Sequence, residues 1–314
     1  MHRSISDGEL PPTDPNRDSA VFGAVLTAFR PGPELVTAVT AAASQVATVV
    51  VVVDEHPISA PTRAILEQCR AVGADVVEHD TNRGIGAALN TGVAWLRSRP
   101  GEPVTHVLTL DQDSGVPPGY VNALAATADR ATDQGVPVGM VAPDSVGTII
   151  RLWPRSAERS SDDGGVVVGG EPIQSGLWVP MTVLTAVDGF DESLFIDGVD
   201  TDFFLRAADH GLRCIISPGT RLEHRLGTAI TTAGRELPLV VAADFRYFYQ
   251  WRNLVLLVRR HAVRHPAWAV TAVVRSLRHL LIVSVLSTGR RRRLSHAASG
   301  LRAGLRGERG KAAA

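Results

Sequence analysis

The sequence predicts an α/β protein with a mostly parallel sheet flanked by helices, followed by a basic helical extension at the C-terminal end. Residues 21–27 and 48–53 are two short apolar runs, the second made only of Thr and Val. Stretches with helical spacing of apolar residues separate such runs. Strands that are apolar throughout and alternate with helices are typical of a parallel sheet buried on both faces.

The elements alternate through the first half of the chain. Helical spacing begins at Leu35, Val36 and Val39, between the first two strands. Ligands of such doubly wound sheets bind at the carboxyl ends of the strands. The further expected elements are a helix at 61–72, a strand at 74–78, a helix at 85–97, a strand at 106–110 and a helix at about 120–130.

Charge is divided unevenly along the 314 residues. Residues 245–314 carry 15 basic residues and one acidic residue, a net charge of +14, and the rest of the chain carries −14. This basic end suggests an anionic surface as partner, and no nucleic-acid recognition motif accompanies it. We expect a disordered leader at 1–18, an α/β domain at 19–240, helices at 241–298 and a disordered basic tail at 299–314.

Two cysteines set the expected compartment. Cys69 and Cys214 lie far apart and form no metal-binding spacing. Residues 1–16 contain three prolines, Asp7 and Glu9 in place of the apolar core of a signal peptide. We therefore expect reduced, buried thiols in a cytoplasmic protein.

Carboxylates follow two of the predicted strands. Asp54 follows the second strand, and Asp111-Gln112-Asp113 begins where the strand at 106–110 ends. Two carboxylates separated by one residue can face a common divalent cation, which needs hard oxygen ligands and can bridge to phosphate. The alternative is an ordinary acidic turn, since such triplets are common in turns.

A glycine-containing block opens the helix at 85–97. In Asn82-Arg83-Gly84-Ile85-Gly86, the glycines would let a ligand approach the backbone amides at the helix start. The third glycine of a dinucleotide fingerprint is missing, and the block follows the third strand instead of the first. A tight turn that allows close packing of helix and sheet is the alternative.

The carboxylates are densest at residues 188–206. Apolar spacing predicts a helix from Val199 to about Gly211, which puts Asp200 in its first turn. Acidic side chains there favour the positive end of the helix dipole, so Asp200 and Asp202 could serve only the helix. A carboxylate held beside apolar walls is also what a general base requires.

Taken in order, these motifs resemble the inverting glycosyltransferases of family 2, which have the nucleotide-sugar (GT-A) fold, and most of all the bacterial rhamnosyltransferases that use dTDP-rhamnose. The resemblance runs from residue 21 to about residue 253. It rests on Asp54, the block at 82–92, Leu110–Ser114, Ser175-Gly176, the block at 189–200, His224 with Gly227, and Arg252-Asn253.

The resemblance implies a role for each matching residue. Asp200 would be the catalytic base, and Asp113 with His224 would ligate Mg²⁺ or Mn²⁺, although a single histidine is more often structural. The nucleotide-sugar would contact Thr27, Phe29, Asp54, Asn82, Gly84, Asn90, Asp111, Asp113 and Arg252. The acceptor would contact Ser175, Gly176, Asp191, Glu192 and Asp197, and Asp197 and Asp202 are further candidates for the base.

The chain departs from the family pattern at two places. Val199 stands before Asp200 where the family often has Glu, so any role of that Glu is absent here. Asp54 is followed by Glu55-His56-Pro57 in place of the frequent Asn-x-Ser, which puts the nucleotide contacts in question. Residues 156–165, which are polar and rich in glycine, are expected to form a mobile loop over the site.

The basic end is predicted to be helical. A helix at about 242–261 carries Arg252, either near the diphosphate or on the surface. Residues 268–286 are strongly apolar but contain Arg275, Arg278 and His279, so we expect a helix that lies on a membrane or docks on the core instead of crossing a bilayer. The arginines at 290–293 would suit anionic headgroups on the inner face of the cell membrane.

The sequence therefore favours a metal-dependent rhamnosyltransferase that uses dTDP-rhamnose, or another nucleotide-sugar, and extends a glycan or a polyprenyl-diphosphate-linked acceptor in cell-surface polysaccharide synthesis. Two alternatives stay open. One is a transferase that uses a UDP-sugar donor of galactofuranose or a hexose. The other is a non-catalytic membrane partner with the same fold, which the retention of Asp113, Asp200 and His224 disfavours.

Overall fold

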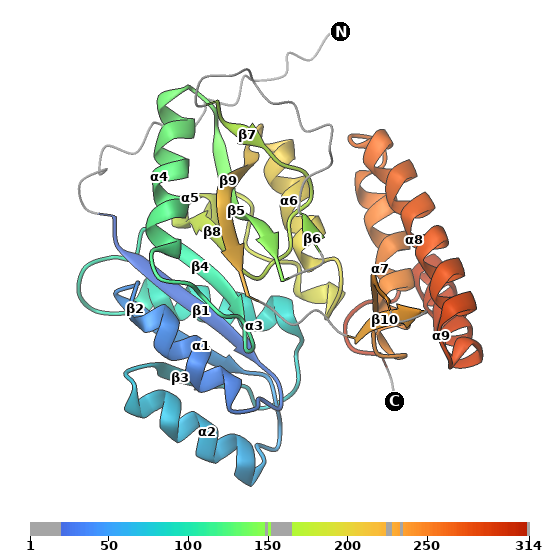
Figure 1. Cartoon of the computed structure of the whole chain (residues 1–314), viewed down its shortest axis with the longest axis horizontal. Coiled ribbons are helices and arrows are strands. Elements are labelled where there is room, and N and C mark those ends of the chain that lie inside the picture. The colour runs from blue at the N-terminus through green and yellow to red at the C-terminus, as the bar shows by residue number, and fades with distance from the viewer. Residues whose placement is uncertain (1–19, 148–149, 152–164, 224–227, 233–234, 313–314) are drawn as a thin grey trace, which may run out of the picture.

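The computed structural model describes residues 20–147, 150–151, 165–223, 228–232 and 235–312. Its centre is a nine-stranded sheet in the order β3-β2-β1-β4-β8-β5-β9-β7, with β6 paired to β5 (Figure 1). The strands are β1 (Phe22–Ala28), β2 (Thr48–Val53), β3 (Asp75–Glu78), β4 (His106–Asp111), β5 (Val138–Val146), β6 (Ile150–Arg151), β7 (Val167–Val168), β8 (Leu177–Pro180) and β9 (Arg213–Leu222).

The described sheet is mixed, and the predicted parallel arrangement holds for β3, β2, β1 and β4. Strands β2 and β4 flank β1 and run parallel to it, and β5 pairs in parallel with β9. Strand β8 runs antiparallel to both β4 and β5 and joins the two halves. Strands β1, β2 and β4 are almost fully buried, which explains why each is a continuous apolar run.

Helices cover the sheet and follow the predicted spacing within one to three residues in the first half of the chain. Cys69 and Cys214 are buried free thiols, as expected. The helices of this part are α1 (Glu34–Ala43), α2 (Ala60–Ala71), α3 (Ile85–Ser98), α4 (Tyr120–Asp133), α5 (Met181–Ala186) and α6 (Val199–Asp209), with the 3-10 turn η2 (Glu192–Leu194) before α6.

Three helices at the C-terminal end gather beside α6 (Figure 1). They are α7 (Arg246–His261), α8 (Pro266–Leu286) and α9 (Arg290–Arg306), and the hairpin of β10 (Thr228–Thr232) and β11 (Arg235–Val241) precedes them. Gly300 lets α9 lie directly on α7, because a Cβ added there would be 2.1 Å from the backbone oxygen of Phe248.

The predicted disordered tail at 299–314 is wrong over most of its length. Helix α9 continues to Arg306, and the amide of Gly310 donates to the carbonyl of Ser193 over 2.6 Å. Small residues make these contacts, and small residues carry little of the apolar signal on which a helix prediction depends. The leader at 1–18, His224 and all but the last residue of the loop at 156–165 lie outside the described residues, so those predictions stand untested.

Candidate active site

The carboxyl ends of β1, β2 and β4 bring three predicted residues to one edge of the sheet. Thr27 on β1 is in register with Asp111 on β4 and with Val52 on β2. Asp54 follows β2 directly, and its amide donates to the carbonyl of Ala28 over 2.8 Å. The exposed Phe29 lies beside them, held by its amide, which donates to Gln112 over 2.8 Å.

Asp54 holds the turn that opens α3. One carboxylate oxygen accepts from the amide of Arg83 over 2.8 Å and lies 2.8 Å from the imidazole of His79, and the other accepts from the amide of Gly84 over 2.7 Å. The side chain is almost fully buried. Contact with a nucleobase therefore stays a prediction, whereas the bonds to the turn fix the start of α3 relative to β2.

The space beside Gly84 is filled by the block at 189–200, and not by the sheet as the packing alternative predicts. Gly84 has a φ of +91°, and a Cβ there would lie 2.3 Å from the carbonyl oxygen of Phe195. The same carbonyl accepts from the amide of Ile85 over 2.8 Å. Glycine at this position lets the block at 189–200 dock on the first turn of α3.

Asn90, about one and a half turns further along α3, also binds the block at 189–200. Its amide nitrogen donates to the carbonyl of Phe190 over 2.9 Å, and its oxygen accepts from the amide of Phe190 over 2.9 Å. It also donates to Glu192, which in turn pairs with Arg83 over 3.0 Å. Asn90 and Glu192 thus join helix to block, and any contact with donor or acceptor would be additional.

Two residues expected to bind the acceptor are structural in this chain. The side chain of Ser175 is fully buried; its hydroxyl accepts from the amide of Asp111 and lies 2.6 Å from the hydroxyl of Ser114. The carbonyl of Gly176 accepts from the buried hydroxyl of Tyr120 over 2.8 Å. Contact of these two residues with the acceptor stays a prediction. The contacts of Ser175 and Gly176 hold the segment that leads into β8 next to Asp111.

Asp200 lies in the first turn of α6, partly buried, where its carboxylate accepts from the amide of Thr201 over 2.8 Å. Burial, together with the negative charges of Glu171 and Asp197, raises the pKa of Asp200 to about 6. No salt bridge to Asp200 exists among the described residues. A carboxylate that is ionised near neutral pH and is not neutralised by a cation fits the requirements of a general base.

The neighbouring carboxylates are paired. Asp197 receives two hydrogen bonds from Arg246, of 2.6 and 3.1 Å. Burial alone would lower the pKa of Arg246, but Asp197, and more weakly Asp111 and Asp200, raise it. Arg246 therefore lies within electrostatic reach of both the β4 end and the start of α6. This supports the expected meeting of these two segments at one site.

Asp202 is excluded as the base. It is fully buried and lies 2.7 Å from Arg206, 2.9 Å from Arg260 and 2.9 Å from His261. Although burial alone would raise it, the pKa of Asp202 is lowered to about 2 by these three partners. Arg260 also pairs with Asp191, whose other oxygen caps the 3-10 turn at Ser193. Asp202 and Asp191 thus tie α6 and the turn to α7.

The contact of Arg252 with the diphosphate stays a prediction, and the structure shows Arg252 in contacts within the protein. Arg252 is almost fully buried and donates to the carbonyls of Leu194 and Gly310, and its guanidinium lies 4.9 Å from the ring centre of Tyr249. Desolvation lowers its pKa. The side chain of Arg252 joins the C-terminal end of the chain to the block at 189–200, because it donates to a carbonyl of each segment.

Two residues of the candidate site, Glu171 and Arg246, were not predicted from the sequence. Glu171 accepts from the hydroxyl of Thr201 and pairs with Arg275 over 2.8 Å. Neither residue lies in a motif or follows an apolar strand that ends at the site, and 31 arginines make one more arginine uninformative. Only the packing of α7 and α8 against α6 reveals them.

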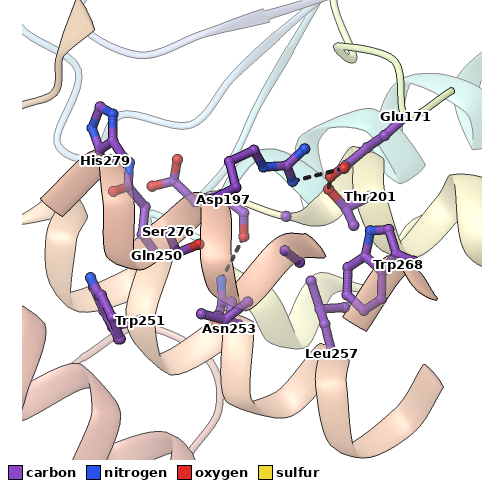
Figure 2. A pocket seen from close by; sticks show the side chains of 14 residues that line it. Glu171, Asp197, Thr201, Gln250, Trp251, Asn253, Leu257, Trp268, Ser276 and His279 are labelled. Atoms are coloured by element: carbon purple, nitrogen blue, oxygen red, sulfur yellow. Dashed lines mark hydrogen bonds and ion pairs between the residues drawn. The ribbon is translucent and has the colours of Figure 1, made fainter. Parts of the chain in front are cut away.

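A cavity of about 360 Å³ lies beside the first turn of α6, between α7 and α8 (Figure 2). Its polar end contains Glu171, Asp197 and Thr201, and the tryptophans Trp251 and Trp268 line its other walls. The remaining lining residues are Gly198, Gln250, Asn253, Leu254, Leu257, Ala272, Arg275, Ser276 and His279.

The donor set near β4 suits a hard divalent cation. Asp111 and Asp113 offer carboxylate oxygens at the strand end, which is the ligand type that Mg²⁺ and Mn²⁺ prefer. No group of three potential metal ligands occurs among the residues that the structure describes. His224, which the resemblance adds to this set, is outside them. The oxygen ligands fit, and the full ligand set stays a prediction.

The sheet order, the reversed strand β8 and the strand-end carboxylates define the nucleotide-sugar (GT-A) fold of glycosyltransferases. A solved structure, that of GalNAc-T7 with UDP, GalNAc and Mn²⁺, matches with a TM-score of 0.52 at 12% sequence identity. The match covers 76% of this chain and 51% of the other, so the chain spans about half the length of that protein. At this identity the likeness establishes the fold.

The sequence is similar to one family of enzymes. Residues 24–163, a little under half of the chain, match the model described as glycosyl transferase family 2. The chain is 26% identical over 208 residues to the dTDP-rhamnosyl transferase RfbF of Shigella flexneri, which covers 64% of this chain and 68% of that protein.

The contrast between the two carboxylates of α6 predicts different effects of substitution. We expect Asp202→Asn to lower the free energy of unfolding by ~1–3 kcal/mol, because it removes the charge of a fully buried carboxylate that binds Arg206 and Arg260. Asp200→Asn should change it little, because no cation loses a partner. Urea unfolding followed by circular dichroism measures both.

The pH dependence of stability provides a second measurement. Because the folded-state pKa of Asp202 lies below its unfolded value, its stabilisation is present above about pH 4 and is lost as the pH falls toward 2. Asp202→Asn should therefore flatten this part of the stability profile. Equal losses of stability in Asp200→Asn and Asp202→Asn would contradict the assignment.

Proposed function

We propose that the chain transfers a rhamnosyl group from dTDP-rhamnose to a hydroxyl of a glycan acceptor, with inversion at the anomeric carbon and with Asp200 as the base. One observation carries the proposal: Asp200 combines a pKa of about 6 with the lack of an ion-pair partner among the described residues, while Asp197 and Asp202 are neutralised by cations. The similarity to a dTDP-rhamnosyl transferase supports the donor.

The proposed reaction requires few protein groups. Asp200 accepts the proton of the acceptor hydroxyl as the acceptor oxygen bonds to the anomeric carbon. The bond from that carbon to the diphosphate oxygen breaks on the opposite face, and dTDP leaves with the bonding electrons. A positioned base contributes a factor of ~10²–10⁴ to such a rate. Arg246, held by Asp197, adds positive charge between the two segments of the site.

The donor is proposed to lie along the carboxyl ends of β1, β2 and β4. Thr27, Phe29 and the turn at Asp54 and Asn82 would face the nucleotide, and Asp111 would contact it near the diphosphate. Asp113 and His224 would hold Mg²⁺ or Mn²⁺. The cation, when bound, neutralises the charge that develops on the leaving diphosphate.

The acceptor is proposed to occupy the cavity beside α6. Of the residues expected to contact it, Asp197 lines this cavity, and Asp191 and Glu192 are engaged elsewhere. Indole faces and a few polar groups are a common lining for sugar rings, since the rings offer apolar C–H faces and hydroxyl edges. A glycan or a polyprenyl-diphosphate-linked acceptor would enter here and would have to extend one hydroxyl past the lining residues Gly198 and Thr201 to Asp200, which does not itself line the cavity.

A UDP-sugar donor is the second candidate, because the solved structure with this fold contains UDP. The purified protein should release nucleoside diphosphate from dTDP-rhamnose and a glycan acceptor, and release should stop when EDTA removes divalent cations. UDP-galactofuranose and UDP-hexoses provide the comparison. Reaction with UDP-sugars alone would overturn the rhamnosyl donor, and full activity in EDTA would overturn the metal.

Removal of the base should abolish transfer while the donor still binds. For Asp200→Asn we expect kcat to fall by a factor of ~10²–10⁴ with unchanged affinity for dTDP. Because the base must be ionised, kcat/KM of the wild type should rise with pH up to about 6 and level off above it. A variant with near-normal turnover would remove Asp200 from this role.

Glu171→Gln tests the cause of that pH profile. Loss of the nearby negative charge makes the ionised form of Asp200 easier to reach, so its pKa should fall and the rising limb should move to lower pH. Activity at high pH should change less than activity at low pH. A limb that stays in place would show that another group controls it.

Ser276→Leu tests the acceptor cavity. The added side chain projects into the space between α7 and α8, so we expect kcat/KM for the acceptor to fall about tenfold or more, which corresponds to ~1.4 kcal/mol. Slow hydrolysis of the donor in the absence of acceptor should be unchanged. Thr271→Leu, at an exposed position of the same helix, is the matched control. Equal acceptor kinetics in both variants would move the acceptor out of this cavity.

A further inference from the structure

Exposed apolar side chains are concentrated in the C-terminal helices. The described residues contain thirteen large hydrophobic side chains that are exposed, and ten of them lie between Val263 and Leu305. Large exposed apolar patches on a folded protein mark interaction sites. The ten are Val263, Val270, Val274, Leu277, Leu281, Val285, Leu286, Leu294, Leu301 and Leu305.

Helix α8 carries five of these residues as a single stripe, which we call the outer stripe: Val270, Val274, Leu277, Leu281 and Val285. Their spacing of three or four residues keeps them on one face of the helix. Sixteen residues separate its ends inclusively, so the stripe is about 22 Å long at 1.5 Å per residue. It is long enough for a flat surface to contact several turns at once.

The opposite face of α8 packs against the rest of the protein. Trp268, Arg275, Ser276 and His279 line the cavity beside α6, and Ala272 and Val283 are buried. At 100° per residue these positions are centred roughly 160° from the outer stripe. One helix therefore forms a wall of the proposed acceptor cavity with one face and leaves an apolar face uncovered with the other.

Helix α8 is long and apolar enough to cross a membrane, by length and composition. Its packing opposes a crossing. Arg275 pairs with Glu171 of the α/β domain over 2.8 Å, and the carbonyl of Val283 accepts from Arg293 of α9 over 2.7 Å. To cross a bilayer, the helix would have to break these contacts and place Arg275 and Arg278 in hydrocarbon. The contacts hold it parallel to the protein surface instead.

Exposed arginines next to the outer stripe favour an anionic partner surface. Arg278 on α8 and Arg290, Arg291 and Arg292 at the start of α9 are exposed, and none has an ion-pair partner among the described residues. Three arginines in the first turn of α9 oppose the helix dipole, which favours anions there. An anionic partner would offset this repulsion, and a cationic or purely apolar partner would not.

We propose that the outer stripe of α8, together with the arginines that begin α9, binds the surface of an anionic lipid bilayer, with α8 lying in the plane of the interface. Apolar side chains enter the boundary of headgroups and acyl chains while arginines meet anionic headgroups, as in other interfacial helices. The enzyme would thus be peripheral on the inner face of the cell membrane. This inference stands independently of the donor and of the reaction.

Flotation with vesicles tests the surface without any substrate. The full chain should bind phosphatidylcholine vesicles that contain phosphatidylglycerol, and bind vesicles of phosphatidylcholine alone at least about tenfold more weakly. Val274→Gln/Leu277→Gln/Leu281→Gln should lower binding at least about tenfold. Val72→Gln, an exposed apolar residue outside these helices, is the control and should bind normally. Arg290→Gln/Arg291→Gln/Arg292→Gln should bind more weakly and lose much of its dependence on salt.

Three outcomes would overturn the proposal. Undiminished binding by the α8 variant, with a normal unfolding transition by circular dichroism, would exclude the outer stripe. A concentration-dependent dimer of the wild type that the same substitutions abolish, without vesicle binding, would assign the stripe to a second copy of the chain. Resistance of vesicle-bound protein to extraction by alkaline carbonate would show that α8 crosses the bilayer.

Discussion

The position of Asp200 depends on how the chain between Leu194 and Gly198 is held. Phe195 and Asp197 have positive φ values of 65°, a conformation that costs ~1–3 kcal/mol for such residues. The amide of Asn253 on α7 compensates by donating to the carbonyls of Leu194, Ile196 and Asp197 over 2.7–2.9 Å. Without these three hydrogen bonds, the turn that precedes α6 and Asp200 would lack its restraint.

The block at 189–200 is held from two sides. Asn253 on α7 binds one side, and α3 contacts the other. Gly84 receives the carbonyl of Phe195, and Asn90 binds the backbone of Phe190. Asp54 in turn fixes Gly84 to the end of β2. A continuous chain of hydrogen bonds therefore links the carboxyl end of β2 to the block that leads into α6. Asp54, Gly84 and Asn90 hold this geometry through contacts within the protein.

The first half of the fold was predictable because its strands are buried on both faces and its helices have one apolar face. Strands β7 and β8 have two and four residues, too few to show a period. Arg252 shows the limit for sites: its identity is compatible with a phosphate contact or with burial under carbonyl acceptors, and only packing decides. Asp200 and Asp202 are two residues apart in sequence, yet their pKa values shift in opposite directions, because burial and neighbouring carboxylates act on Asp200 whereas Arg206, Arg260 and His261 bind Asp202.

The last described residues of the chain are part of this architecture. Arg252 donates to the carbonyl of Gly310, the amide of Gly310 donates to Ser193, and the amide of Ala312 donates to the hydroxyl of Tyr249 over 3.0 Å. The segment is thus wedged against the turn that leads to Asp200. An affinity tag or fluorescent protein fused directly behind it would strain these contacts, so a spacer at this junction is advisable in any labelled form of the protein.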